Sequence, residues 1–294
     1  MDDNTLLYIF YDIDNFCKFY NREIKMNLIE NKKIKRNRAH KLEISEIVTI
    51  SILFHFSGYY CFKKYYEGLV LKYWTLEFKN LVSYNRFLEL RKKYLMVMYL
   101  YLNIKILKKD SKFNFIDSFC LKVSHEKRRS SHKVFKNMAS KGKTSVEWIY
   151  GFKLHLITDL KGELVSFMVT PANYADNNAD AIKQLTKNMS GKIYGDKGYL
   201  LNSELTDYLN QKNITFITKS RKNMKPKKIS PDDSSILKKR GIIESIGKIL
   251  KESMQLEHAR HRSIEGFISH ILSCLIAYSF KDSKPSFFSN LAIA

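Results

Sequence analysis

The first 109 residues have the apolar spacing of helices. Glycine is scarce and proline is absent there, and apolar and aromatic side chains recur every three or four residues. The segment 44–52 gives one amphipathic helix, with isoleucine and valine on one face and Ser45 and Thr49 off that face. Another helix is expected to include residues 87–98. The N-terminal part is therefore predicted to be an all-α domain.

The pattern changes near Asp110, where short apolar runs alternate with turns. Strands are predicted at 114–119, 150–157, 164–170, 192–195 and 214–218, and helices at 178–187, at 203–210 and from about 241 onward. The second and third strands are joined by a turn sequence that ends in Gly162, so they form a hairpin. A hairpin joined to strand–helix units gives an α/β fold with a mixed sheet flanked by helices. We predict two domains, 1–109 and 110–294.

Basic residues are in large excess. The chain carries 51 Lys and Arg against 29 Asp and Glu, a formal net charge of +22. This excess favours a polyanionic partner, of which nucleic acid is the commonest, although solvated lysine faces are the alternative. A basic run at 31–41 fits either a DNA-binding helical module or a packing or dimerisation domain with a solvated loop.

Several classes of protein are disfavoured by what the sequence lacks. The N-terminus has no signal-peptide order, and no apolar run approaches the roughly 18 residues that span a bilayer. There is no Gly-rich phosphate loop or dinucleotide motif, and the four cysteines lack zinc spacing. We expect a soluble, cytoplasmic protein with neither a membrane partner nor a nucleotide cofactor.

Three acidic residues occupy unusual positions. Asp117 lies inside an apolar strand, Asp196 directly follows a strand, and Glu244 lies in the first turn of a helix among isoleucines. A carboxylate in an apolar strand must be paired, metal-bound or costly, and strand carboxyl ends are where α/β sheets bind ligands. The spacings, 79 (196 − 117) and 48 (244 − 196), mean that only folding can bring the three together. Taken singly, such an acid is more often a turn or salt-bridge residue.

A group of three converging acids suits one particular chemistry. Two divalent ions about 3.5–4 Å apart can activate an attacking oxygen and stabilise the leaving one in phosphodiester cleavage. Hard ions such as Mg²⁺ prefer carboxylate oxygen. The acids therefore make metal-dependent phosphoryl transfer a candidate activity.

Four sequence blocks, in order along the chain, carry a family resemblance. They are Ile116-Asp117-Ser118, then Tyr150-Gly151-Phe152-Lys153-Leu154-His155-Leu156, then Gly195-Asp196-Lys197-Gly198-Tyr199, and finally Arg240, Glu244 and Lys251. Together they resemble bacterial insertion-sequence transposases of the DDE superfamily, over about residues 110 to 280. One position departs from the pattern, because many relatives carry a tyrosine three residues before the arginine, where this chain has Leu237.

The resemblance implies an RNase H-like catalytic domain. Asp117 would lie on its first strand, Asp196 just after its fourth strand and Glu244 on the following helix. These three acids would be catalytic and would bind two Mg²⁺ ions, which Mn²⁺ can replace. The enzyme would cut double-stranded DNA at the terminal inverted repeats of its element, and the freed 3′-hydroxyl would attack target DNA. A homodimer is expected, because two element ends must be held in one complex.

Basic side chains near these blocks are the expected DNA contacts. They are Arg240, Lys251, Lys197, Lys153, Lys222 and Lys225. Arg240 and Lys251 are expected to bind phosphates by resemblance. Lys153 suits either a backbone contact or a structural role in which its stem covers apolar surface. The basic segment 219–228 is expected to border the catalytic cleft, where phosphate binding competes with a solvated loop as its role.

Two other functions fit the same residues. A related metal-dependent nuclease would cut DNA without strand transfer. A non-catalytic DNA-binding protein derived from a transposase would be expected to have damaged acids, whereas all three are present.

Overall fold

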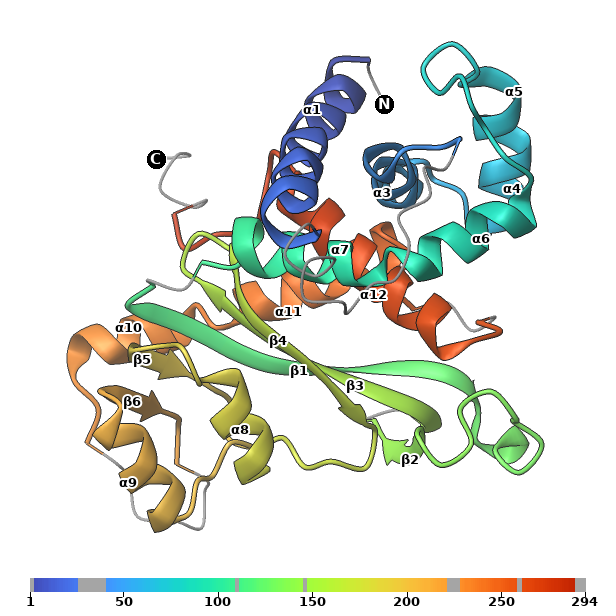
Figure 1. The fold of residues 1–294 in the computed structure, drawn as a ribbon. Helices are drawn as coiled ribbons and strands as arrows, with labels where there is room; N and C mark the ends of the chain where they lie inside the picture. The colour runs from blue at the N-terminus through green and yellow to red at the C-terminus, as the bar shows by residue number, and fades with distance from the viewer. Residues whose placement is uncertain are drawn as a thin grey trace. The chain divides into compact units, whose positions relative to one another are not determined.

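The computed structural model describes residues 3–25, 41–108, 111–144, 147–220, 228–257 and 261–288. The chain forms two compact units (Figure 1). The first consists of Met1–Ile106, Ser253–Leu256 and His261–Phe280, and the second of Leu107–Glu252, Glu257–Arg260 and Lys281–Ala294. Among the described residues, no helix combines the length and the apolar character needed to cross a membrane.

The first unit is helical, as the apolar spacing predicts. Its elements are α1 (Asp3–Phe19), η1 (Tyr20–Lys25), α3 (Ile44–Leu53), η2 (Phe54–Phe56), α4 (Phe62–Tyr65), η3 (Tyr66–Val70), α5 (Leu71–Tyr73), α6 (Tyr84–Lys93), α7 (Leu95–Tyr101), η4 (Leu102–Ile106) and α12 (Ile264–Ser279). The helix predicted to include residues 87–98 is divided into α6 and α7, with Tyr94 between them.

Helix α3 differs from its predicted pattern. An amphipathic helix was expected, but nine of its ten residues are buried, Ser45 and Thr49 included. The reason is that α1, α6 and α12 all pack against it, so it has no solvent face. Ser51 bonds to the helix backbone at the carbonyl of Ile47, at 2.7 Å, whereas the hydroxyl of Thr49 has no hydrogen-bond partner among the described residues.

Helix α12 belongs to the first unit although it is near the end of the sequence. Most of its residues are buried, and it packs against α3, α6 and α7. His55 and Ser273 are hydrogen-bonded at 2.9 Å in the interior of this unit, 218 residues apart in the chain. Sequence patterns placed all of 110–294 in one domain, because a helix that is apolar on every side does not reveal which partner covers it.

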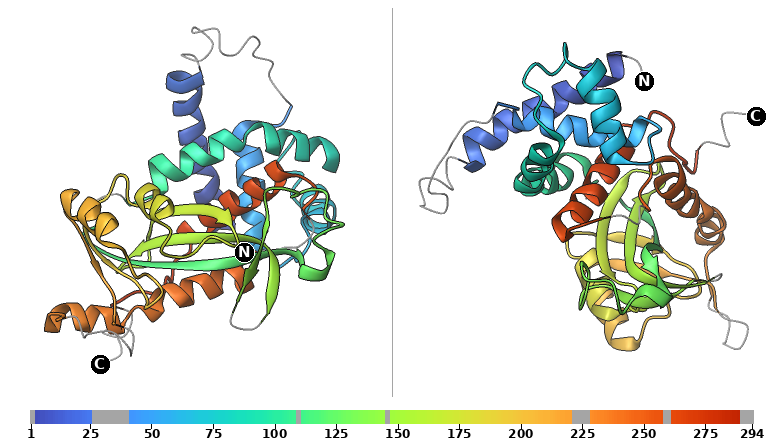
Figure 2. Two further views of the ribbon diagram at one scale, coloured as in Figure 1. Left: turned by 90° about the horizontal axis from the view of Figure 1, so that it is seen from below. Right: turned by 90° about the vertical axis from the view of Figure 1, so that its right-hand side faces the viewer.

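The second unit contains a six-stranded sheet. Its strands are β1 (Phe113–His125), β2 (Ser140–Lys143), β3 (Trp148–Asp159), β4 (Leu164–Pro171), β5 (Gly191–Tyr194) and β6 (Ile214–Ile217). The order is β2-β3-β1-β5-β6, and β4 also pairs with β3. β1, β3 and β4 are antiparallel neighbours, whereas β5 and β6 run parallel to β1. Figure 2 shows β1 and β3 as one long curved pair.

Helices cover both faces of this sheet. The helices described in this unit are η5 (Glu126–Arg128), α8 (Ala179–Leu185), α9 (Ser203–Gln211), α10 (Pro231–Lys238), α11 (Gly241–Lys248) and η6 (Ile249–Ser253). On one face, Ile116 packs with buried isoleucine and leucine side chains from α8 and α9. On the other, Phe115 packs with Leu237 of α10 and Ile243 of α11. The predicted mixed sheet flanked by helices is confirmed.

Two elements of this unit were not predicted. Strand β2 forms within the polar connection after β1, where its short sequence Ser-Lys-Gly-Lys has little strand character. Because of β2, Asp196 follows the fifth strand in chain order and not the fourth. Helix α10 begins with Ser230 as N-cap, whose hydroxyl accepts the Asp233 N–H at 3.1 Å, and with Pro231 in its first turn. That serine–proline start is a helix signal that the basic linker before it obscured.

Candidate active site

Strand register places Asp117 and Asp196 at matching positions. β1 and β5 are parallel, with Phe113 opposite Lys192 and Phe115 opposite Tyr194. Each of these pairs is separated by 79 residues, which is also the spacing of Asp117 and Asp196. Asp196 follows the end of β5 by two residues. If the pairing of β1 and β5 is continued by two residues, Asp117 is therefore opposite Asp196, at the end of β5.

A tight turn after β5 orients Asp196. Its Oδ1 accepts the Gly198 N–H at 2.7 Å, and its carbonyl accepts the Tyr199 N–H at 3.2 Å. A Cβ at Gly198 would lie 2.9 Å from Asp196 Oδ1, so glycine permits this close approach. Tyr199 is buried against Phe216, which anchors the end of the turn.

Asp117 is mostly buried and has few hydrogen-bond donors. Its side chain is 20% exposed; Oδ1 accepts the Ser118 N–H at 2.8 Å, and Oδ2 lies 3.7 Å from Arg240 Nη1. Burial raises the pKa of Asp117 to about 6, and the nearby charges of Asp196 and Glu244 add to the rise. The Ser118 N–H and Arg240 act in the opposite direction. A carboxyl with a raised pKa among other acids is typical of a functional site.

Helix α11 brings Glu244 to the same place. Arg240 Nη2 donates to Glu244 Oε1 at 2.6 Å, so one guanidinium links Glu244 to Asp117. One turn further along, α11 rests on β1, where a Cβ at Gly247 would lie 2.1 Å from the ring of Phe119. Glycine thus allows the helix to approach the strand, while Glu244 stays 56% exposed.

A cavity of about 410 Å³ opens beside these residues. It is lined by Gly195, Asp196, Lys197, Lys219, Leu237, Lys238, Arg240, Gly241 and Glu244. Asp117 does not line it, but is connected to its wall through Arg240. Acids and cations therefore share one open site at the end of β5.

The acidic side chains of the site are of the kind that binds divalent metal ions, but in this conformation they do not form a coordination site. Carboxylate oxygens are the preferred ligands of Mg²⁺ and Mn²⁺. Across the described ranges, however, no three His, Cys, Asp or Glu side chains lie close enough together to hold a metal ion. Arg240 lies between Asp117 and Glu244 and forms an ion-pair contact with each. Joint binding of a metal ion by these two carboxylates would require the guanidinium to move away.

The other predicted DNA contacts differ in their surroundings. Lys197 is exposed at the cavity. Lys251 is ion-paired with Glu257 at 2.8 Å. The ammonium of Lys153 donates to Asp176 and to the carbonyl of Tyr174, both at 2.8 Å, and only 12% of that side chain is exposed. In this conformation Lys153 serves as a tether for the loop after β4.

Two further predictions concern the basic linker. Lys222 and Lys225 lie outside the described residues. Lys219, at the start of the same segment, is described and lines the cavity. Lys228 at its other end is exposed.

Several residues of the site were not found from sequence. Asp176 accepts the Ser118 hydroxyl at 2.5 Å in addition to Lys153, which fixes the loop beside the strand that carries Asp117. Glu257 binds Lys251 and also accepts the Lys122 N–H of β1 at 3.0 Å. Both acids act through tertiary contacts between distant segments, and no local pattern distinguishes them from ordinary surface acids.

Comparison with known proteins identifies the family. A family model described as "Transposase DDE domain" matches residues 108–264, a range that contains Asp117, Asp196 and Glu244. No curated protein matches the chain.

Solved structures give only weak similarity. The Mos1 strand transfer complex is 14% identical over 85% of this chain and 82% of that chain, with a TM-score of 0.26. The Mos1 mariner paired-end complex with Mn is 13% identical over 92% of this chain and 88% of that chain, with a TM-score of 0.24. TM-scores of this size support no argument about fold or function. The family model alone spans more than half of the sequence, and the chain therefore belongs to the transposase DDE domain family.

Proposed function

We propose that this transposase is encoded by a bacterial insertion sequence, cuts DNA at the ends of its element and joins the freed 3′-hydroxyl to target DNA. The main support is the convergence of its acids. Asp117 lies on β1 and Asp196 follows the neighbouring parallel strand β5, at the 79-residue spacing of the paired positions, and Arg240 connects Glu244 to Asp117. These side chains come from three separate segments and meet beside one open cavity.

Asp117, Asp196 and Glu244 would hold two Mg²⁺ ions, which Mn²⁺ can replace. When bound, such ions activate the attacking oxygen and stabilise the leaving oxygen of a phosphodiester. The protein orients its donors by backbone contacts, because the Gly198 N–H holds one oxygen of Asp196 and the Ser118 N–H holds one oxygen of Asp117. The other oxygen of Asp117 lies 3.7 Å from Arg240 and would become available when that guanidinium moves away.

Arg240 is proposed to exchange partners during the reaction cycle. In the structure its guanidinium contacts both Asp117 and Glu244. Once released from them, a planar guanidinium suits bidentate binding of a DNA phosphate. Lys197, Lys219 and Lys238 line the same cavity and would attract the phosphodiester backbone.

The proposed substrates are duplex terminal inverted repeats and duplex target DNA. Two element ends must be held together during transposition, so a homodimer is proposed as the working form. The helical first unit is assigned either DNA binding or dimerisation. Lys251 is proposed as a phosphate contact that replaces its pairing with Glu257 when DNA binds.

A cleavage and strand-transfer assay tests the proposal. The full chain is incubated with DNA that carries the gene's own flanking ends, in Mg²⁺ or in EDTA, beside Asp196→Asn and the matched variant Asp232→Asn. Asp232 is an exposed acid on α10, outside the residues that line the cavity. Joined products are expected in Mg²⁺ from the wild type and Asp232→Asn only.

Other outcomes lead to the alternatives. Nicks or breaks without joined strands would assign the chain to the metal-dependent nucleases. Normal DNA binding without cleavage by any variant would point to a non-catalytic protein derived from a transposase. Equal losses in the two variants would remove Asp196 from the proposed site.

A further inference from the structure

A basic lobe lies at the far end of β1 from the catalytic acids. We define the basic lobe as residues 126–143, which comprise η5, the turns after it and β2. It contains seven Lys or Arg residues and a single acid, Glu126. Six of its cations are exposed: Lys127, Arg128, Arg129, Lys133, Lys136 and Lys143. The lobe therefore concentrates positive charge on its surface.

The basic lobe has its own packed interior. Phe135 is 1% exposed, and its ring meets that of Phe152 edge-to-face at 5.4 Å. The Tyr150 hydroxyl donates to the carbonyl of Phe135 at 3.1 Å. Asn137 adopts the left-handed conformation, with φ of 65°, which turns the chain back toward β2. These contacts fix the backbone, so the cations are presented from an ordered surface.

The basic lobe has few acidic side chains to balance its positive charge. Glu126 forms an ion pair with Lys141, whose ammonium lies 3.1 Å away. No ion pair involves the side chains of Lys127, Arg128, Lys133 or Lys136 among the residues that the structure describes. Like charges gathered on one surface repel each other, and an external polyanion relieves that repulsion.

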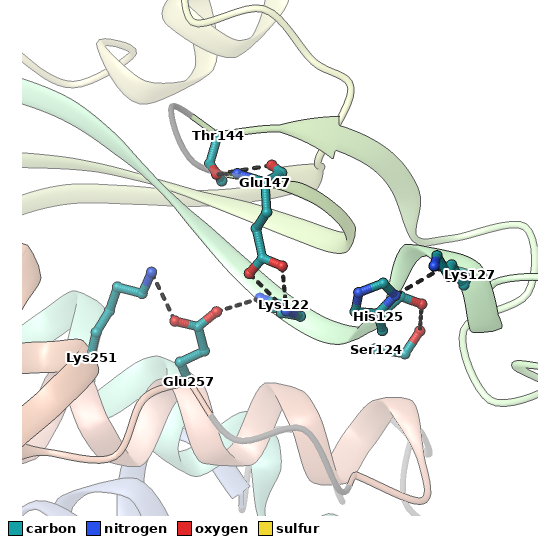
Figure 3. A network of polar contacts seen from close by, with 8 residues as sticks. All are labelled: Lys122, Ser124, His125, Lys127, Thr144, Glu147, Lys251 and Glu257. Carbon is teal, nitrogen blue, oxygen red and sulfur yellow. Dashed lines mark hydrogen bonds and ion pairs between the residues drawn. The ribbon is translucent and has the colours of Figure 1, made fainter.

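A polar network joins the root of the basic lobe to the helix segment that follows Glu244 (Figure 3). Lys122 of β1 pairs with Glu147 at 2.7 Å, and its backbone N–H donates to Glu257 at 3.0 Å. The other oxygen of Glu257 lies 2.8 Å from the ammonium of Lys251. The network lies where the register of β1 and β3 shifts, between Lys122 and Ser124.

Contacts along β1 show that α11 and η6 run beside it in the same direction. Arg240 contacts Asp117, Gly247 contacts Phe119, and Lys251 reaches Lys122 through Glu257. Lys251 therefore lies between the catalytic acids and the basic lobe. Two cations, Lys251 and Lys122, each paired with a glutamate, thus lie between the cavity and the basic lobe.

The length of β1 fixes the scale of this arrangement. Eight residues separate Asp117 from His125, where the strand ends. At roughly 3.4 Å per residue they span about 27 Å, which matches about eight base pairs of duplex at 3.4 Å each.

We infer that the basic lobe is a second DNA-binding surface, which holds duplex phosphates about eight base pairs from the phosphate at the catalytic acids. The distance of about eight base pairs between the two phosphates rests on the proposed function, whereas the binding of duplex by the lobe does not. Trp148, the exposed first residue of β3 beside the lobe, is flanked by Lys141 and Lys143, whose ammonium groups lie 4.2 and 5.6 Å from its ring centre. A ring in such a setting is suited to report on a bound duplex.

The test compares two triple variants with equal loss of charge. One removes Arg128, Lys133 and Lys136 from the basic lobe by substitution with alanine. The other removes Lys108, Lys161 and Lys187, three exposed lysines of the same unit outside the lobe. Affinity of the full chain for a 30-base-pair duplex is measured in EDTA by fluorescence anisotropy across a salt series, after both variants are shown to unfold at the parental temperature.

The expected result is a selective loss in the lobe variant. Its affinity should fall about tenfold or more, and its slope of log affinity against log salt should become shallower by about 2 to 3, because three phosphate contacts are lost. The control variant should change by less than about threefold. Equal losses in both variants, or no loss in the lobe variant, would overturn the inference. Loss of binding to anionic lipid vesicles with intact duplex binding would also overturn it.

Tryptophan fluorescence provides an independent reading. The chain has two tryptophans, Trp74 and Trp148. Substitution Trp74→Phe leaves Trp148 as the only one, and its emission should change when duplex is added to the parent but not to the lobe variant. An inactive enzyme that still binds through the lobe would refute only the proposed function. An active enzyme whose two triple variants bind alike would refute only the lobe.

Discussion

In two largely buried aspartates of the second unit, Asp117 and Asp233, the pKa is shifted in opposite directions. Their side chains are 20% and 13% exposed. Asp233 accepts hydrogen bonds from Lys192 at 2.8 Å, Tyr194 at 2.7 Å and the Ser230 hydroxyl at 2.7 Å. Burial opposes its ionisation, but these three donors outweigh it and lower the pKa of Asp233.

Asp117 lacks such a set of donors. It receives one backbone N–H and a guanidinium at 3.7 Å, while two further acids lie nearby, and burial with their charge raises its pKa to about 6. The difference separates two uses of a buried carboxylate. Asp233 is stabilised as an anion by donors within the protein and joins α10 to β5. Asp117 has only one distant counter-charge, Arg240 at 3.7 Å, and therefore suits an added cation.

The largest expected contrast is in catalysis. Asp117→Asn should lower DNA cleavage in Mg²⁺ by about 10³-fold or more, since about 4 kcal/mol of transition-state stabilisation is lost with a metal ligand. Asp233→Asn should retain cleavage within about tenfold below its unfolding temperature, because Asp233 makes only internal contacts. Single-turnover cleavage of labelled end DNA measures both. Comparable losses in the two variants would erase the functional distinction.

The next contrast is the pH dependence of stability without metal. Folded Asp117 holds its proton up to pH about 6, whereas the ordinary value is 3.8, so native stability falls as pH rises through this window. Asp117→Asn removes that loss, and its stability relative to wild type should increase by about 2 kcal/mol from pH 4 to pH 7. Urea unfolding in EDTA at several pH values gives this difference.

Asp233 should show the opposite sign. Its folded pKa is lowered, so its contribution is present above the ordinary value and is lost as pH falls through the folded pKa. The cost of Asp233→Asn should therefore diminish in acid. A pH-independent difference for the Asp117 variant would contradict the raised pKa of Asp117.

A smaller effect is expected for the stability of Asp233→Asn at neutral pH. The amide retains one acceptor but leaves Lys192 without its charge partner, which should destabilise the protein by about 2 kcal/mol after allowance for the partial exposure of Lys192. The unfolding temperature should fall by about 5 °C. An unchanged midpoint in calorimetry would show that α10 does not depend on this contact.

The smallest effect is expected from the neighbouring acid. Asp232 is exposed in the first turn of α10, so Asp232→Asn should change stability by less than about 0.5 kcal/mol. Cleavage should be unaffected. A larger change in either quantity would mean that negative charge at the start of α10 contributes by itself. The effect of Asp232→Asn would then have to be subtracted from that of Asp233→Asn.

Much of the sheet was predictable because its signals are local. The hairpin of β3 and β4 follows from alternation and from a turn in which Asp159 accepts the N–H groups of Lys161 and Glu163, both at 2.8 Å. Strands β5 and β6 follow from short apolar runs between helices. The burial of α3 and the association of α12 depend on which helices cover them, and local periodicity carries no such information.

The candidate site was predictable in its members but not in its geometry. The meaning of the 79-residue spacing depends on the pairing of β1 with β5, which the sequence does not specify. The position of Arg240 between two acids likewise depends on how α11 lies on β1, and that depends on the close approach at Gly247. Asp176 and Glu257 are recognisable only from long-range contacts.

The membership of α12 in the first unit has a consequence for synthesis. The N-terminal helices leave the ribosome early, yet the partner that covers α3, α6 and α7 is made only when residues 264–279 emerge. All six strands of the second unit come from residues 113–217, so that sheet can form while the first unit still exposes apolar surface. The part of the transposase that is translated first is thus expected to be the last to finish folding, and premature termination before α12 should leave a chain prone to aggregate.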